Sequence, residues 1–129
     1  MGSSSVRSST RVLVVDDEET LRDFYAALLQ DEGYTVETAT AGNEAYEKMS
    51  LGGYDLVLLD LMIPELSGTE IVEKLHLTKP QKPNKAVVAL TNLADEKVAA
   101  HLAELGVKGY LVKSNYTPDV LLAEVKKFL

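Results

Sequence analysis

Short runs of consecutive aliphatic residues recur along the chain and are separated by longer segments with helical periodicity. Continuous apolar runs as short as these are typical of parallel strands that are covered on both faces. Residues 35–39 alternate between polar and apolar instead, which predicts a strand nearer the edge of the sheet. The predicted strands are residues 12–15, 35–39, 56–59, 86–90 and the short segment 110–112.

The segments that follow these strands carry the periodicity and the end signals of helices. In the first, apolar residues at positions 21, 24, 25, 28 and 29 lie on one helical face, and Gly33 is suited to end the helix. The sequence SGTE at residues 67–70 has the form of a capping box, and Thr117 followed by Pro118 begins the last helix. The predicted helices cover about residues 21–29, 43–50, 67–75, 98–105 and 117–128.

Strands and helices therefore alternate along the whole chain. Because crossovers between parallel strands are right-handed, this order predicts an α/β fold, a doubly wound five-stranded parallel sheet with helices on both faces. No linker or second domain is evident, so residues 11–129 are expected to form one domain. Residues 1–10 are rich in serine and lack periodicity, and we expect a flexible arm or an expression remnant there.

The charge balance narrows the classes of partner. The 129 residues include 13 Lys and Arg against 20 Asp and Glu, a formal net charge of -7, which argues against direct binding of nucleic acid or of an anionic membrane. The chain has no cysteine, which excludes disulfides and thiolate metal sites. No apolar run has the length of a membrane span and no signal peptide is evident, so we expect a cytoplasmic protein without membrane insertion.

Reactive side chains follow four of the five predicted strands. Asp16 and Asp17 come after the first, Asp60 after the third, Thr91 after the fourth and Lys113 after the fifth. Ligands bind in such sheets at the carboxyl ends of the strands, so all five side chains are expected to face one crevice. Each alone has a simpler explanation, as a helix cap, a loop acid or a surface lysine. Their joint occurrence at four strand ends favours a functional site.

An acidic cluster of oxygen ligands suits a hard divalent cation, and Mg²⁺ binds one or two carboxylates together with water and phosphate oxygens. Asp17 and Asp60 could bind it directly, and Asp16 through a water molecule. A carboxylate beside the ion could attack phosphorus and form an aspartyl phosphate. Mg²⁺, Lys113 and the Thr91 hydroxyl would then each contact a different phosphoryl oxygen. The sequence thus predicts Mg²⁺ as the cofactor and phosphoryl transfer as the reaction.

Four motifs occur in order at the predicted strand ends: VVDDEE, LLDLMIPELSG, ALTN and GYLVK. Together they resemble the motifs of response-regulator receiver domains of two-component signalling, over essentially the whole chain after residue 10. The resemblance implies a flavodoxin-like sheet with strand order 2-1-3-4-5. It also implies that Asp60 is the phosphorylated residue. Asp17, Asp60 and the backbone carbonyl of Met62 would hold Mg²⁺.

The same resemblance implies a switch. Thr91 and Lys113 would assist catalysis, and Thr91 and Tyr110 match a pair in which the hydroxyl moves onto the phosphoryl group and the ring turns inward behind it. The surface that they control would be the fourth helix, the fifth strand and the fifth helix. The implied partners are a sensor histidine kinase or a histidine phosphotransfer protein, and a downstream effector protein or output domain. The domain would be no enzyme toward other substrates, catalysing only its own phosphorylation and dephosphorylation.

The chain departs from this family pattern at one position. The family's lysine usually precedes proline, in a bond that is typically cis, whereas Ser114 follows Lys113 here. A cis bond costs about 2.5–4 kcal/mol before a non-proline residue, against about 0.5–1 kcal/mol before proline. We therefore predict a trans Lys113–Ser114 bond, with the Lys113 side chain still reaching the carboxylate of Asp60.

Three other functions share parts of the pattern. A flavodoxin-like flavin carrier needs a phosphate-binding loop after the first strand, where the acids here would repel the flavin phosphate. A phosphatase of the haloacid dehalogenase type would have its nucleophile and a second acid two residues apart there, whereas Asp16 and Asp17 are adjacent. A pseudo-receiver that only binds proteins would not need the complete acidic set with its hydroxyl and ammonium. His76 and His101 are isolated on predicted helices, and we expect them to be surface or boundary residues rather than phosphohistidines or ligands.

Overall fold

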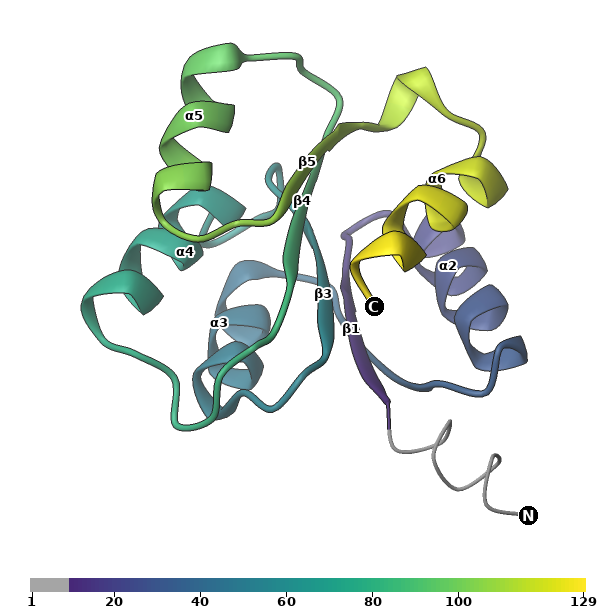
Figure 1. Cartoon of the computed structure of the whole chain (residues 1–129), viewed down its shortest axis with the longest axis horizontal. Coiled ribbons are helices and arrows are strands. Elements are labelled where there is room, and N and C mark those ends of the chain that lie inside the picture. The colour runs from purple at the N-terminus through teal and green to yellow at the C-terminus, as the bar shows by residue number, and fades with distance from the viewer. Residues whose placement is uncertain (1–9) are drawn as a thin grey trace.

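The computed structural model describes residues 10–129, so the arm predicted at residues 1–10 lies outside the described residues except for Thr10. Figure 1 shows one parallel sheet between two layers of helices, and the strand order is β2-β1-β3-β4-β5, as predicted. No helix in this part of the chain is long and apolar enough to cross a membrane. The strands are β1 (Arg11–Val15), β2 (Thr35–Ala39), β3 (Leu56–Asp60), β4 (Val87–Thr91) and β5 (Gly109–Val112). The helices are α2 (Glu19–Asp31), α3 (Gly42–Leu51), α4 (Gly68–Leu77), α5 (Glu96–Glu104) and α6 (Pro118–Val125), with 3₁₀ turns η1 (Lys113–Asn115) and η2 (Lys126–Phe128).

The strands divide their side chains between two cores. In β1, Val12 and Val14 pack into the core that α2 and α6 cover, whereas Leu13 and Val15 face the core under α3, α4 and α5. Figure 1 shows these two groups of helices on opposite sides of the sheet. This alternation follows from the period of two in a strand. The central strand β3 is buried along its whole length, which explains its continuous apolar sequence.

Two strands extend further toward their carboxyl ends than the sequence predicted. β3 includes Asp60, and β4 begins and ends one residue later than expected. The parallel ladder is the reason, because Asp60 is paired with Leu90 and Thr91 with Val112. These two polar residues are therefore held by the sheet itself rather than by the loops that follow it.

The helix ends agree in part with the sequence signals. The capping box is present: the Ser67 hydroxyl accepts a hydrogen bond from the Glu70 N–H at 3.1 Å, and the Glu70 carboxylate accepts one from the Ser67 N–H at 2.9 Å. Thr117 occupies the N-cap of α6 as predicted, but its side chain makes no capping bond. α5 begins at Glu96, earlier than predicted, because the Asp95 carboxylate accepts hydrogen bonds from two backbone N–H groups of the first turn.

Candidate functional site

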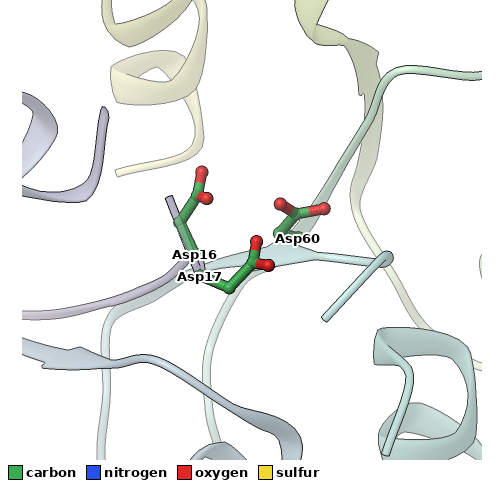
Figure 2. Close-up of side chains that lie close together, drawn as sticks. All are labelled: Asp16, Asp17 and Asp60. Carbon is green, nitrogen blue, oxygen red and sulfur yellow. The ribbon is translucent and has the colours of Figure 1, made fainter. Parts of the chain in front are cut away.

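Three aspartates meet where β1 and β3 end. Figure 2 shows their side chains projecting to the same side of the strand ends. One carboxylate oxygen from each of Asp16, Asp17 and Asp60 lies within 4.8 Å of the others. Asp16 is fully buried and Asp60 is 5% exposed, whereas Asp17 is open to solvent. The adjacency of β1 and β3 in the sheet thus brings together the three acids that the sequence singled out.

Lys113 lies against the two buried carboxylates. Its Nζ is 2.7 Å from Asp16 Oδ2 and 2.9 Å from Asp60 Oδ2, and its side chain is only 10% exposed. Two carboxylates buried side by side would repel each other without a nearby cation. Lys113 therefore supplies, from within the chain, part of the positive charge that this acidic cluster requires.

Burial and the neighbouring opposite charges shift the pKa values of Asp60 and Lys113 in opposite directions. Burial raises the pKa of Asp60 above its ordinary value, and the hydrogen bonds from Lys113 and from the Met62 N–H offset only part of that rise. Burial lowers the pKa of Lys113, but its hydrogen bonds to Asp16 and Asp60 outweigh this effect, so that the pKa is raised. The protonated ammonium is accordingly the stable form of Lys113 at neutral pH.

The residues after Asp60 hold its carboxylate in place. Asp60 Oδ1 accepts a hydrogen bond from the Met62 N–H at 3.0 Å, and the Leu61 N–H donates to the Leu90 carbonyl at 2.9 Å. Gly68 passes so close that a Cβ there would lie 2.9 Å from the backbone oxygen of Asp60, so the position requires glycine. The Met62 carbonyl, a predicted metal ligand, belongs to this same turn, and the Met62 side chain is 60% exposed.

Thr91 and Tyr110 are joined through the backbone of one residue. Thr91 is 3% exposed, and its Oγ1 accepts a hydrogen bond from the Leu93 N–H at 3.1 Å. Tyr110, whose side chain is half-buried, donates its hydroxyl to the Leu93 carbonyl at 2.9 Å. Thr91 does not cap α5, since Asp95 does. The predicted switch pair therefore shares Leu93, which the sequence did not indicate.

The peptide bond after the lysine is trans. Residues 10–129 contain no cis peptide bond, which confirms the prediction for Lys113–Ser114. Lys113 begins the turn η1, which the Tyr116 N–H closes on the Lys113 carbonyl at 3.2 Å. The ammonium still reaches Asp60, as predicted.

Arg22 is a second cation near the site, and it was not among the residues predicted from the sequence. Its Nη1 donates to the backbone carbonyl of Asp16 at 3.0 Å, which ties the first turns of α2 to the end of β1. One signal could have indicated it, because Arg22 is the only cation between Asp16 and Asp23. A helix beginning just after the acids brings such a residue back toward them within one turn.

The two histidines lie at the surface, as predicted. Both His76 and His101 are exposed. His101 Nε2 lies 2.8 Å from Glu73 Oε2, a contact between α5 and α4 whose two side chains are nearly half exposed. Exposed pairs of this kind contribute little to stability, and we assign the histidines no part in the site.

The acidic cluster fits a hard divalent cation. Its three side chains offer only carboxylate oxygens, which are the ligands that Mg²⁺ prefers. The Asp17 side chain faces solvent and has no hydrogen-bond or ion-pair partner among residues 10–129, so its oxygens are available. The Asp16 carboxylate already accepts hydrogen bonds from Lys113 and from the Glu18 N–H at 2.9 Å. Its contact to the ion through water stays a prediction.

The protein-family description "Response regulator receiver domain" matches residues 12–126. The sensory transduction protein RegX3 of Mycobacterium tuberculosis is 37% identical over 120 residues, which cover 93% of this chain and 51% of RegX3. The transcriptional regulatory protein ResD of Bacillus subtilis is 33% identical over 122 residues, covering 95% of this chain and 49% of ResD. The chain thus spans about half the length of these curated relatives.

Solved structures agree with this match. The response regulator protein TrrA of Thermotoga maritima, in complex with Mg²⁺-BeF, is 36% identical with a TM-score of 0.73, and the match covers 93% of this chain and 99% of TrrA. A CheY-like receiver domain protein of Methanospirillum hungatei is 30% identical with a TM-score of 0.77, over 92% of this chain and 91% of that one. The family match includes β1 from its second residue, the other four strands in full, and the carboxyl ends that hold the acidic cluster. This chain therefore belongs to the family of response regulator receiver domains of two-component signalling.

Proposed function

We propose that this domain takes a phosphoryl group onto Asp60 from a sensor histidine kinase or a histidine phosphotransfer protein, in a Mg²⁺-dependent reaction. The observation that carries the proposal is the position of Lys113, whose ammonium bridges Asp16 and Asp60 beside the solvent-facing carboxylate of Asp17. A nucleophilic carboxylate, a fixed cation and a metal-binding acid then lie within reach of one phosphoryl group.

In the proposed transfer, a carboxylate oxygen of Asp60 bonds to phosphorus while the P–N bond to the donor's histidine ring breaks. The ring nitrogen keeps the electron pair and takes a proton from solvent. Lys113 moves its hydrogen bond from Asp60 to a phosphoryl oxygen, and the Thr91 hydroxyl donates to another. Hydrolysis by water later regenerates the Asp60 carboxylate, so the domain catalyses only its own phosphorylation and dephosphorylation.

Asp17, Asp60 and the Met62 carbonyl would hold Mg²⁺ in this proposal. When bound, the ion neutralises charge on the phosphoryl oxygens and on the surrounding carboxylates. The similar protein TrrA was solved in complex with Mg²⁺-BeF, and the all-oxygen donor set here supports the same cofactor.

The proposed output surface is α5, β5 and α6, which are the fourth helix, fifth strand and fifth helix in chain order. A Thr91 hydroxyl drawn toward a phosphoryl group would shift the Leu93 backbone that it contacts, and Leu93 carries the acceptor of the Tyr110 hydroxyl. α5 buries only one of its residues, Leu102. A helix with so little buried surface can move at low energetic cost, which suits a surface that responds to phosphorylation.

The partners follow from the same proposal. The curated relatives include transcriptional regulatory proteins about twice as long as this chain, so the output is expected from a further domain or a separate effector protein. The receiver domain itself would not contact nucleic acid, given its net charge of -7. A cytoplasmic location, where histidine kinases present their phosphorylated histidine, is part of the proposal.

Acetyl phosphate with Mg²⁺ tests the acceptor directly. We expect mass spectrometry to find one acid-stable, base-labile phosphoryl group per chain, which does not form when Mg²⁺ is chelated beforehand and is absent in Asp60→Asn. Asp31→Asn, which makes the same change at an exposed position in α2, should be modified like the wild type. An adduct on another residue would overturn the assignment of Asp60. No adduct under any condition would favour a pseudo-receiver instead.

A further inference from the structure

Glu65 has a backbone conformation that glutamate rarely adopts. Among residues 10–129 it is the only residue other than glycine with a positive φ, at 76°. In this left-handed region the side chain of an L residue crowds its own backbone. Glu65 lies in the connection between β3 and α4, which starts directly after Asp60. A strained conformation beside a site persists only where surrounding contacts enforce it.

The enforcing contacts come from the first turn of α3. Glu65 Oε1 accepts a hydrogen bond from the Asn43 N–H at 3.1 Å, and the neighbouring Pro64 carbonyl accepts one from the Gly42 N–H at 2.8 Å. The first N–H groups of a helix have no partner within the helix, and a carboxylate is favoured there by the helix dipole. Ala41, the N-cap residue of α3, makes no side-chain bond that could replace these contacts.

The connection is also packed tightly at both ends. A Cβ added to Gly42 would overlap the backbone of Leu66, so the tip of the connection rests directly on α3. At its base, the Gly68 N–H donates to the Leu61 carbonyl at 3.0 Å and closes the loop. The segment between these two fixed points includes Met62.

We infer that Glu65 is a positioning residue for the Mg²⁺ site, through its hydrogen bond to α3. The inference rests on the proposed function, because it takes Asp60 and the Met62 carbonyl as metal ligands. These two residues share one turn through the bond from the Met62 N–H to Asp60 Oδ1. Without its bond to α3, residue 65 relaxes toward negative φ and the peptide units before it rotate. Both ligand oxygens then lose their fixed orientation, and the affinity for Mg²⁺ falls.

Calorimetric titration of Mg²⁺ into the unphosphorylated chain tests this inference. Glu65→Ala removes the acceptor and should raise the Kd for Mg²⁺ about 10-fold, the effect typical of lost outer-sphere partners. Glu65→Gln removes the charge but keeps an oxygen acceptor, and its Kd should stay within about threefold of the wild type. Thermal unfolding without Mg²⁺ checks that each variant is folded, as expected for an exposed position.

Asn43→Pro breaks the same hydrogen bond from its other side. Proline lacks the N–H donor and is tolerated in the first turn of a helix. Its Kd should match that of Glu65→Ala, and the double variant should be no weaker than either, because both changes remove one interaction. If Asn43→Pro fails to fold, the comparison of Glu65→Ala with Glu65→Gln still shows whether the hydrogen bond of Glu65 affects the affinity for Mg²⁺.

Two results overturn the inference alone: Glu65→Ala binding Mg²⁺ like the wild type, or Glu65→Gln losing as much affinity as Glu65→Ala. The second result would mean that the charge of Glu65, and not its hydrogen bond, affects the ion. A wild-type chain that binds no Mg²⁺ would instead overturn the proposed cofactor, and this inference with it.

Discussion

Lys113 is the residue on which the acidic site depends most directly. Its ammonium pairs with Asp16 and Asp60, and the three side chains are each at least nine-tenths buried. Removing one member of a buried charged group leaves the others uncompensated in a medium of low dielectric constant. The same change at a surface ion pair has little effect, because water and salt replace the lost partner.

Replacing Lys113 should therefore destabilise the domain. Lys113→Met keeps much of the side-chain volume and should lower the free energy of unfolding by about 3 kcal/mol at neutral pH without divalent cations. Mg²⁺ should restore part of this loss, because it binds the folded state and neutralises the same carboxylates. Urea unfolding with and without Mg²⁺ measures both effects.

Lys126→Met is the matched control for that measurement. Lys126 pairs with Glu32 at 3.1 Å, but both side chains are about a third exposed or more. Its loss should cost less than about 1 kcal/mol and should not respond to Mg²⁺. Equal losses in the two variants would show that Lys113 does not compensate the buried acids.

At this scale, side chains were easier to predict than backbone groups. Asp16, Asp60 and Lys113 could be found because each stands at the end of an apolar run. The role of Leu93 could not, since it acts through its N–H and carbonyl, which every residue type except proline offers. The positive φ of Glu65 was equally hidden, because the residue type argues against it.

Among the elements, β1, β2 and the segment before β3 are tied together at the end of the sheet opposite the acidic cluster. Arg11 Nη2 lies 2.7 Å from Glu37 Oε2, and the Tyr54 hydroxyl donates to Glu37 Oε1 at 2.9 Å. The Arg11 guanidinium also lies 4.5 Å from the centroid of the Tyr54 ring. Burial, together with the hydrogen bond to Glu37, raises the pKa of Tyr54 to about 12.

Because this pKa is raised, the stabilisation that Tyr54 gives the fold should change with pH in the alkaline range. An unfolded tyrosine ionises near pH 10, at about its reference value. Because the pKa is higher in the folded state, the contribution of Tyr54 is fully present below about pH 10 and is lost as the pH rises toward the folded pKa of about 12. Tyr54→Phe should be about 1 kcal/mol less stable than the wild type near neutral pH, since it loses the hydrogen bond.

The difference between Tyr54→Phe and the wild type should then shrink across that alkaline window. Urea unfolding of both proteins at a series of pH values measures it, with Tyr34→Phe as a control for loss of a phenol outside this cluster. If the difference in free energy of unfolding between the two proteins stays constant over this alkaline range, the hydrogen bond from Tyr54 to Glu37 does not stabilise the fold as proposed.

The elements themselves could be predicted because their apolar periodicity is local in the sequence. Their ends depend on partners that periodicity does not reveal. β4 ends at Thr91 because its ladder with β5 continues to Val112, and α5 starts early because Asp95 caps it. The first of these corrections matters for function, since it places the Thr91 hydroxyl on the sheet.

For the molecule as a whole, phosphorylation is expected to shift an existing equilibrium rather than to build a new fold. The proposed coupling passes from the phosphoryl group to Thr91 and through Leu93 to Tyr110. Thr91→Ala should leave Asp60 able to accept a phosphoryl group. It should reduce the response of Tyr110 to less than about half of the wild-type change, because one contact that favours the shifted state is lost.

NMR of the Tyr110 ring, with Mg²⁺ and beryllofluoride added as a phosphoryl mimic, measures that response. Thr69→Ala, in the first turn of α4, serves as the control for loss of a threonine and should respond like the wild type. An unchanged Tyr110 response in Thr91→Ala would remove Thr91 from the coupling. A Tyr110 ring that never responds would remove Tyr110 itself.

The Arg11–Glu37 pair has a further consequence, which concerns separate copies of the chain. β2 closes one edge of the sheet, and an edge strand can template pairing with a strand from another molecule. Here the edge is only 5 residues long, and Glu37 stands at its centre with its side chain 37% exposed. A second sheet docking edge to edge would bring two such glutamates together and disturb their arginines. We therefore expect the contact between β1 and β2 also to oppose edge-to-edge association of the sheet.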